Sequence, residues 1–316
     1  MTGPARPPPQ VVILMATLNG GRWLDDQLGS IAAQQGCDWA LCIGDDGSTD
    51  DTCARVTRFA ARHPGRDIRL HRGGGRGAAA NFLALLARPD LPLGPDTHVA
   101  LADQDDIWLP RKLARATARL AAAGPGPAIY GAQSLHVDAQ GRITGRSRPP
   151  QGEVTLARAL VQNPVRGHAL VLNPAAVRLA RRAGAPGVAF HDWWLALLVL
   201  ACGGRAVIDR AVVLHYRQHR GNLLGGAGGI RAGLRRAGLL GRGEWRRWLA
   251  TNRDALAALP AAGVALDPGA QALLGALADA PASGPARVAA FARAGLRRDR
   301  RVENAVLRLC LLAGLA

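Results

Sequence analysis

Short apolar runs alternate with stretches of helical periodicity along the first hundred residues. The apolar runs are too short for helices and each ends in polar residues, which is the pattern of buried strands. These predicted strands cover residues 11–17, 39–43, 68–70 and 98–101. The segments between them predict helices over 22–34, 50–62 and 81–87. Strands that alternate with helices predict an α/β fold with a mostly parallel sheet flanked by helices on both faces.

Polar clusters follow three of the predicted strands. They are found at Thr17, at Asp45-Asp46 and between Asp103 and Asp106. Ligands of open α/β sheets bind outside the carboxyl ends of the strands. We therefore expect these clusters to meet at one edge of the sheet.

Three carboxylates crowd four positions after the fourth strand, at Asp103, Asp105 and Asp106. Like charges this close raise one another's pKa, and a hard divalent cation with oxygen ligands offsets that repulsion. The alternative is an exposed acidic turn that caps a helix beginning near Pro110, where the helix dipole favours Asp. In that interpretation Asp106 is the capping residue.

Four motifs carry a resemblance to a known family. They read Met-Ala-Thr-Leu-Asn-Gly at 15–20, Asp-Asp-Gly-Ser-Thr-Asp at 45–50, Asp-Gln-Asp-Asp-Ile-Trp-Leu-Pro at 103–110 and Tyr-Arg-Gln-His-Arg-Gly-Asn at 216–222. In this order they resemble the inverting family 2 glycosyltransferases of the GT-A fold, in particular their rhamnosyltransferase-like branch. The resemblance covers residues 10 to 225, and it implies a Rossmann-like, mostly parallel sheet flanked by helices. The C-terminal helical extension that we also expect lies outside the resemblance.

The resemblance implies a site for a nucleoside diphosphate sugar. Ala16 and Thr17 would lie against the base, and Asp46 would hydrogen-bond the base edge. Asp103 would hold the ribose or the metal. Asp105, the last residue of the Asp-x-Asp element, would ligate a divalent ion, Mg²⁺ or Mn²⁺, that bridges the diphosphate.

One segment departs from the family pattern. This branch commonly has an Asn-x-Gly step and a basic residue just before Asn-Phe, whereas this chain has Gly75 and Ala80 there. Gly77 and the pair at 81–82 do fit. Arg76 is near enough to replace the missing positive charge beside the nucleotide.

The acceptor side is expected around two later segments. Asp192 opens an apolar helix where the family has its catalytic base, although it could also be a plain helix cap. Gly167 stands where the family lets the acceptor approach the sugar, in a predicted strand over 167–172. His168 is a further acceptor-side candidate, although a lone His is more often structural, and Trp193 is grouped with these residues.

Arg217 and His219 follow a predicted strand over 206–214 and would share one face if the chain stays extended. The resemblance implies that both meet the donor diphosphate, with His219 also available to the metal. A guanidinium can donate two parallel hydrogen bonds to two oxygens of one phosphate group. A solvated basic loop is the alternative, and it suits Arg220 better than Arg217.

Composition limits the partners. The chain has 316 residues, 48% of them hydrophobic, and forty basic residues against twenty-three acidic ones give a net charge of +17. Such a charge suggests polyanionic partners or an anionic membrane surface. Lys112 is the only lysine, so part of the excess can reflect coding bias towards arginine. Residues 226–316 contain fourteen arginines against six acidic residues.

That basic C-terminal region, 226–316, follows a flexible leader at 1–9 and a glycosyltransferase domain at 10–225. It predicts amphipathic helices over 230–240, 244–259 and 286–312. Two interpretations remain open for these helices: packing on the catalytic domain, or contact with anionic lipid. Trp245 and Trp248 share one helix face in either case.

Localisation follows from what the sequence lacks. No apolar run reaches the roughly 20 residues that a bilayer needs, and no secretory signal precedes the first strand. Five cysteines without paired spacing predict a reduced setting with neither disulfides nor a zinc site. We expect a cytoplasmic protein, and a peripheral position on the inner face of the plasma membrane is left open.

The sequence as a whole predicts a metal-dependent, inverting glycosyltransferase. A sugar would move from a nucleoside diphosphate donor, with dTDP-rhamnose as the leading candidate, to a hydroxyl of a glycan or lipid-linked acceptor. A nucleotidyl-sugar transferase is the alternative enzyme, but it ordinarily has a glycine-rich basic loop after the first strand. A nucleic-acid-binding protein is the non-enzymatic alternative, and the acidic cluster argues against a nucleic-acid partner.

Overall fold

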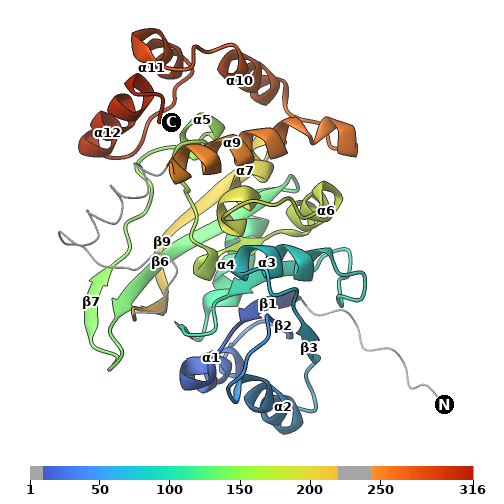
Figure 1. Cartoon of the computed structure of the whole chain (residues 1–316). Coiled ribbons are helices and arrows are strands. Elements are labelled where there is room, and N and C mark those ends of the chain that lie inside the picture. Colours follow the sequence, from blue (N-terminus) through green and yellow to red (C-terminus); the bar gives the residue numbers. More distant parts are fainter. Residues whose placement is uncertain (1–9, 220–242, 316) are drawn as a thin grey trace.

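The computed structural model describes residues 10–219 and 243–315 (Figure 1). Within these ranges nine strands form one sheet in the order β3-β2-β1-β4-β8-β6-β9-β5, with β7 paired to β6. The strands are β1 Val11–Thr17, β2 Trp39–Asp45, β3 Ile68–Arg72, β4 His98–Ala102, β5 Ile107–Trp108, β6 Ala128–Val137, β7 Ile143–Arg146, β8 Val171–Leu172 and β9 Arg205–Arg217. The four predicted strands are thus confirmed, and they pair in parallel with one another. A second parallel pair is formed by β6 and β9.

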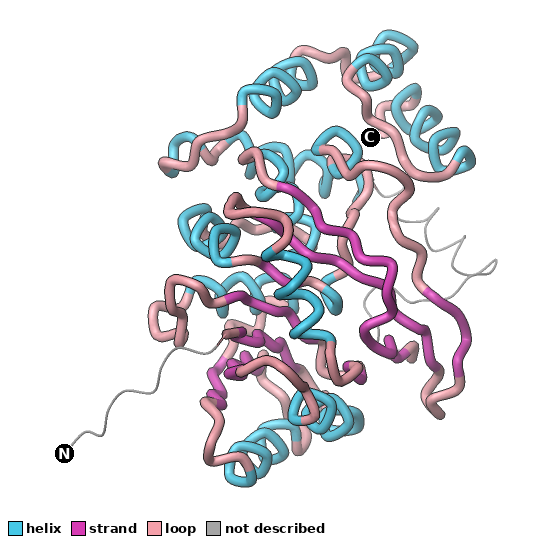
Figure 2. The backbone as a smooth tube through the Cα atoms, turned by 180° about the vertical axis from the view of Figure 1, so that it is seen from behind, coloured by secondary structure: helices cyan, strands magenta, loops and turns pink. Residues whose placement is uncertain are grey.

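Helices cover both faces of this sheet, and the strands lie between them (Figure 2). They are α1 Gly21–Ala32, α2 Thr52–Arg62, α3 Ala78–Ala87, α4 Lys112–Ala121, α5 Leu156–Ala159, α6 Pro174–Ala183, α7 His191–Ala201, α9 Glu244–Ala257, α10 Pro268–Ala278, α11 Gly284–Arg293 and α12 Arg301–Leu312. Short 3-10 helices lie at Gly167–Ala169 and Pro260–Ala262. The helices predicted over 22–34, 50–62 and 81–87 correspond to α1, α2 and α3.

Alternate side chains of β1 explain the two layers. Val11, Ile13 and Met15 pack in a core with α1, α2 and α4. Val12 and Leu14 point the other way, into a core with α3, α6 and α7. Because successive strand residues face opposite sides, an uninterrupted apolar run marks a strand buried on both faces.

The described C-terminal helices belong to the second core. Trp245 and Leu256 of α9, Phe291 of α11 and Leu307 of α12 are buried in the same hydrophobic cluster as α7. The ring of Trp248 packs edge-on against Phe190 at 4.9 Å. These helices therefore pack on the catalytic domain, at the upper end in Figure 1.

Several predictions need correction. Only 171–172 of the predicted strand 167–172 is extended, because Gly167–Ala169 forms a 3-10 turn. The predicted helix over 286–312 is two helices, α11 and α12. Asp106 does not cap a helix, since α4 begins at Lys112, six residues later, and its N-cap is Arg111. The leader 1–9, the predicted helix over 230–240 and residues 220–222 of the fourth motif lie outside the described residues.

Membrane-spanning helices were not expected. In the two described ranges every helix is too short or too polar to cross a bilayer.

Candidate active site

The carboxyl ends of β1, β2 and β4 meet at one edge of the sheet. Thr17 is opposite Asp45 in the β1–β2 register, and Met15 is opposite Ala102 in the β1–β4 register. Asp103 follows Ala102 directly. The three polar clusters predicted from the sequence are therefore neighbours, as parallel pairing requires.

Backbone turns of the first two motifs are tied together by side chains. Asn19 has a positive φ of 48°, which Asn tolerates better than most residues. Its amide donates to Ser48 Oγ at 2.8 Å, and its Oδ1 accepts from the amide of Thr49 at 2.8 Å. The amide of Gly20 donates to Thr52 Oγ1 at 2.9 Å. These bonds hold the end of β1 against the turn after β2.

Asp45 is a structural anion at the centre of this turn. Its carboxylate accepts from Thr17 Oγ1 at 2.9 Å, from the amides of Gly47 and Ser48 at 3.1 and 2.8 Å, and from Ser48 Oγ at 2.5 Å. Burial raises the pKa of Asp45, but these hydrogen bonds outweigh it and the net pKa is lower than usual. Ala16 is half-buried and Thr17 is buried beside it.

Asp46 organises the glycine-rich segment after β3. Its two carboxylate oxygens accept from the amides of Gly75 at 3.3 Å and Gly77 at 2.9 Å. A Cβ at Gly73 would lie 2.2 Å from Asp46 Oδ1, so the chain needs glycine for this approach. The exposed Arg76 lies between the two amides in sequence. Asp46 and Arg76 are thus brought to the same rim of the site.

The carboxylates after β4 differ in their surroundings. Burial raises the pKa of Asp103 to about 7, the charges of Asp105 and Asp192 add to the rise, and Lys112 opposes it. Asp106 is 0% exposed and accepts from the amide of Arg217 at 3.3 Å. Its other oxygen, Oδ2, has no hydrogen-bond partner among the described residues. Burial and the neighbouring carboxylates also raise the pKa of Asp106 well above its usual value.

Lys112 is a buried cation behind these carboxylates. The side chain is 1% exposed, its Nζ donates to the carbonyl of His168 at 2.7 Å, and it lies 3.3 Å above the ring of Trp108. Burial lowers the pKa of Lys112 well below its usual value, against the raising effect of Asp106 and Asp103. Sequence reasoning did not assign Lys112 to the site. The chain has thirty-nine arginines and one lysine, and this single exception could have indicated a position that needs an ammonium group.

His168 lies at the inner end of the same cluster. Its ring stacks on Tyr216 at 4.6 Å, and burial lowers its pKa well below the usual value. Its Nε2 has no hydrogen-bond partner in the described part of the chain. Asp103, Asp106 and His168 each offer a ligand atom, and these atoms lie within 4.8 Å of one another.

This donor set fits a divalent cation. Carboxylate oxygens are the ligands that Mg²⁺ and Mn²⁺ prefer, and two buried polar atoms in the cluster lack a partner. The fixed ammonium of Lys112 repels a cation on the side of Asp106 and His168. The charge of Lys112 also acts on Asp103, whereas the Asp105 carboxylate lies beside His219.

Arg217 and His219 meet Asp105 from two directions. Arg217 Nε donates to the carbonyl of Asp105 at 3.1 Å, and His219 Nε2 lies 2.7 Å from Asp105 Oδ2. The guanidinium of Arg217 also contacts Asp26 at 2.8 Å and lies 4.3 Å from the ring centre of Trp23. The His219 ring stacks on Trp23 at 5.9 Å. Trp23 was not predicted, because a lone aromatic in a helix carries no signal of a site.

Asp192 lies in the first turn of α7 and bonds to the segment that contains Gly167. Its Oδ2 accepts from the amide of Gly167 at 3.0 Å, and its Oδ1 accepts from the amide of Trp193 at 2.8 Å. Its charge reaches Asp103 strongly enough to raise that pKa. The indole of Trp193 points into the core instead, where Nε1 donates to the carbonyl of Ala159 at 2.6 Å.

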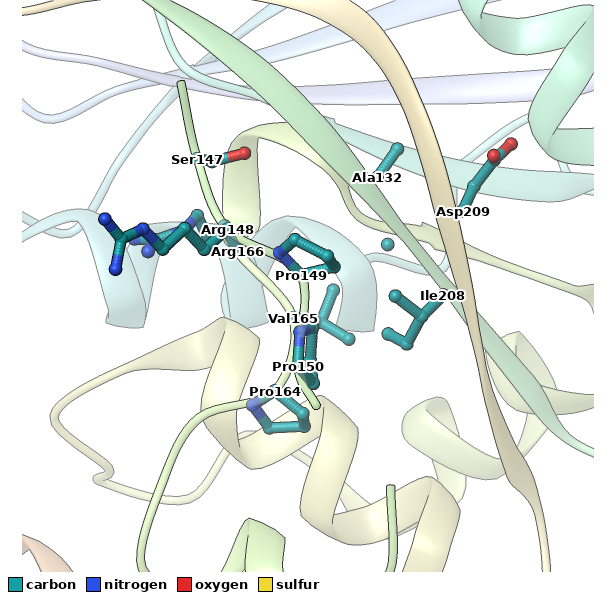
Figure 3. A pocket seen from close by; sticks show the side chains of 11 residues that line it. Ala132, Ser147, Arg148, Pro149, Pro150, Pro164, Val165, Arg166, Ile208 and Asp209 are labelled. Carbon is teal, nitrogen blue, oxygen red and sulfur yellow. The ribbon is translucent and has the colours of Figure 1, made fainter. Parts of the chain in front are cut away.

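Two arginines lie next to this acceptor-side segment. Arg148 and Arg166 line a hollow between β6, β9 and the segment before Gly167, and Figure 3 shows them on the same side of it. Both are exposed, and neither side chain forms a hydrogen bond or an ion pair with the described residues. Asp209, on the opposite side in Figure 3, is already bonded to Arg115 at 2.6 Å. Sequence reasoning did not identify this pair.

Comparison with protein families gives one match. Residues 12–158 fit the model described as "Glycosyl transferase family 2". Among curated proteins, the dTDP-rhamnosyl transferase RfbG of Shigella flexneri is 27% identical over 238 residues, covering 74% of this chain and 81% of that protein.

Comparison with solved structures shows the GT-A fold. S. aureus TarS 1-349 in complex with UDP-GlcNAc aligns with a TM-score of 0.55 at 14% identity, over 90% of this chain and 81% of that one. A second crystal structure of S. aureus TarS 1-349 aligns over 77% of this chain and 65% of that one, with a TM-score of 0.53 and 15% identity. The mannosyltransferase PcManGT from Pyrobaculum calidifontis, in complex with GDP-Man and Mn²⁺, aligns with a TM-score of 0.52 at 23% identity, over 95% and 87%.

Proposed function

We propose that this chain, a glycosyltransferase of family 2, moves a sugar from a nucleoside diphosphate donor to a hydroxyl acceptor with inversion at the anomeric carbon. The observation that carries the proposal is the position of Asp192. It is held by the amide of Gly167 on a later segment than the Asp103–Asp106 motif, yet its charge acts on Asp103. A base separate from the carboxylates that hold the metal is what a single displacement requires.

The donor side is supported by the residues at the ends of β1 and β2. Ala16 and Thr17 would lie against the base, with Asp46 on its edge and Arg76 supplying positive charge. RfbG is named a dTDP-rhamnosyl transferase, which makes dTDP-rhamnose the donor that we propose. TarS and PcManGT are named with UDP-GlcNAc and GDP-Man, so this fold accepts several nucleoside diphosphate sugars.

The metal side is supported by carboxylate chemistry and by a relative. We assign a divalent ion, Mg²⁺ or Mn²⁺, to Asp103 and Asp105, with His219 in reach of Asp105. PcManGT is named with Mn²⁺. Such an ion, when bound, neutralises charge on the departing nucleoside diphosphate. Arg217 adds positive charge next to Asp105 and holds its carbonyl.

The proton moves on the other side of the sugar. The acceptor oxygen attacks the anomeric carbon while its proton passes to the Asp192 carboxylate. The bond between that carbon and the phosphate oxygen breaks, and its electron pair leaves with the nucleoside diphosphate. The amides of Gly167 and Trp193 fix the two Asp192 oxygens before the acceptor arrives.

The acceptor is proposed to be a glycan or lipid-linked precursor that carries phosphate. Arg148 and Arg166 support this, because two unpaired guanidiniums beside the Gly167 segment suit a phosphate or diphosphate group. Besides burial, the positive charge of Arg166 lowers the pKa of His168 and of His136, which supports its assignment to the acceptor side. A cytoplasmic location is part of the same proposal and rests on the cysteine pattern.

A thermal-shift experiment tests the donor and the metal together. A ligand that binds only the folded state raises Tm by mass action, so dTDP-rhamnose with Mn²⁺ or Mg²⁺ should raise the Tm more than either component alone. UDP-GlcNAc and GDP-Man complete the panel. Asp105→Ala should abolish the metal-dependent part of the shift, whereas Asp254→Ala, on the exposed side of α9, should keep it. A metal-dependent shift of equal size in Asp105→Ala would defeat the assignment.

A further inference from the structure

The C-terminal helix α12 is apolar on the face that the described part of the chain leaves exposed. Leu307, Cys310 and Leu311 are buried against the core. On the other face Val302 is 75% exposed and Leu309 is 65% exposed, and Leu312 and Val306 are 43% and 39% exposed. Of the eight large hydrophobic residues exposed in the described chain, five lie in α12 or directly after it. Single exposed apolar residues are ordinary, but a group of this kind marks an interaction surface.

Helical geometry joins these residues into one stripe. Val302, Val306 and Leu309 are four and three residues apart, the spacing that places side chains on one face of a helix. Ala305 and Ala313 lie on the same exposed face. Leu315, 36% exposed, extends the stripe beyond the last turn. The stripe therefore runs along the whole length of α12.

Positive charge borders the stripe. Arg301 and Arg308, seven residues apart, are exposed along one edge, and Arg297 and Arg300 are exposed just before the helix. The nearby acidic groups are engaged, since Asp299 pairs with Arg158 and Glu303 lies 3.4 Å from Arg298. An apolar stripe edged by arginines matches a surface that is apolar inside and anionic outside.

We propose that α12 binds the surface of an anionic membrane. Its stripe would enter the boundary between headgroups and acyl chains, and Arg301 and Arg308 would contact lipid phosphates. This assigns membrane contact to α12 and not to α9, because Trp245 and Trp248 are used for packing inside the protein.

The start of α12 is linked to the acceptor side. Gln162 donates to Asp299 at 2.8 Å, and the amide of Asp299 donates back to Gln162 Oε1 at 2.9 Å. Gln162 lies only four residues before Arg166. A membrane under α12 would therefore lie close to the segment that we assign to a lipid-linked acceptor. Only this link rests on the proposed function, since membrane binding needs no substrate.

Vesicle flotation of the full chain tests the proposal. We expect flotation with vesicles of phosphatidylglycerol and phosphatidylcholine, and binding that weakens as salt rises from about 0.05 M to about 0.5 M because screening shortens the reach of the charges. Vesicles of phosphatidylcholine alone should bind roughly tenfold more weakly. Failure to float with the anionic vesicles at low salt would overturn the proposal.

Variants locate the surface. Val302→Asn with Leu309→Asn should reduce vesicle binding by roughly tenfold or more, because two apolar side chains leave the interface. Ile143→Asn is the matched control, since Ile143 is also 65% exposed but lies on β7. Equal binding by the double variant would exclude α12. Size-exclusion chromatography adds another outcome: a dimer that the double variant dissociates would make the stripe a self-association surface and overturn membrane binding.

Activity and folding measurements keep the two proposals separate. The double variant should unfold at the Tm of the parent and turn over a soluble acceptor at the parental rate. If the parent binds vesicles, the double variant binds them much more weakly and neither protein transfers a sugar, the proposed function fails and the membrane surface stands.

Discussion

The backbone amide of Gly167 donates a hydrogen bond of 3.0 Å to Asp192 Oδ2. A Cβ at Gly167 would lie 3.0 Å from His191 Nε2 and 3.5 Å from Asp192 Cβ, so this contact leaves little room for a larger residue. Gly167 precedes β8 in the sheet, whereas Asp192 opens α7. The pair thus links the start of α7 to the turn before β8 and holds the carboxylate that we propose as the general base.

Asp192→Asn should lower turnover by a factor of roughly 10² to 10⁴, the usual contribution of a positioned acid or base. The amide keeps an oxygen for the Gly167 bond but cannot accept a proton at neutral pH. Donor binding should change little, and thermal shift with the donor checks this. Turnover within a few-fold of the parent, at saturating donor, would leave Asp192 with a structural role only.

Lys112→Arg should destabilise the fold by about 1–3 kcal/mol, because a guanidinium must enter a slot filled by an ammonium over Trp108. Lys112→Met should cost about 3–5 kcal/mol, since buried carboxyls lose their cation. Urea unfolding measures both. Arg111→Lys, on the exposed neighbour, should change stability by less than about 0.5 kcal/mol. An unchanged free energy of unfolding in Lys112→Met would contradict the role of Lys112 as a counter-charge.

Strands β1, β2 and β4 were predictable from the sequence because their apolar runs are buried on both faces. Residues 128–137 were missed because polar positions interrupt the apolar pattern of β6, although most of this strand is buried. Residues 143–146 were missed because β7 is short and mostly exposed. The short strands β5 and β8 have two residues each. β5 is defined by its pairing with β9, and β8 by its pairing with β4 and β6. These partners are distant in the sequence, so a local sequence pattern does not predict the pairing.

The site was predictable only where a motif carries its chemistry. Asp103 and Asp105 were named because three carboxylates crowd four positions in a motif of the resembled family. Asp192 was named because it opens an apolar helix where that family has its catalytic base. Asp106 was misassigned as a cap, because a two-residue strand after it, paired with β9, was not expected. Its burial depends on Arg217, more than one hundred residues away. Such contacts depend on the tertiary structure, so a local sequence pattern does not predict them.

Replacement of Arg148 and Arg166 by Gln should raise the KM for a phosphate-bearing acceptor by roughly tenfold, because charge-assisted bonds to phosphate are lost. The KM for the donor and the turnover at saturating acceptor should stay near the parental values. Arg142→Gln, an exposed arginine in the turn before β7, is the matched control. An unchanged acceptor KM in the double variant would remove the pair from the acceptor site.

Asp209→Asn should lower stability in a pH-dependent way. Asp209 is buried, and it accepts from Arg115 at 2.6 and 3.0 Å and from the Tyr130 hydroxyl at 3.1 Å. Burial raises its pKa, but these bonds and the amide of Ala211 outweigh it and lower the pKa to about 2. The ionised group stabilises the folded state above its ordinary pKa of about 3.9, and that contribution is lost as pH falls towards 2.

The difference between the parent and Asp209→Asn should therefore be about 1–3 kcal/mol at pH 7 and pH 5, and it should shrink as the pH falls below about 4. Urea unfolding at several pH values measures it. Asp254→Asn removes an exposed ion pair with Arg253 and should change stability by less than about 1 kcal/mol. A difference for Asp209→Asn that stays constant from pH 7 to pH 3 would mean that its packing, and not its charge, stabilises the β6–β9 region.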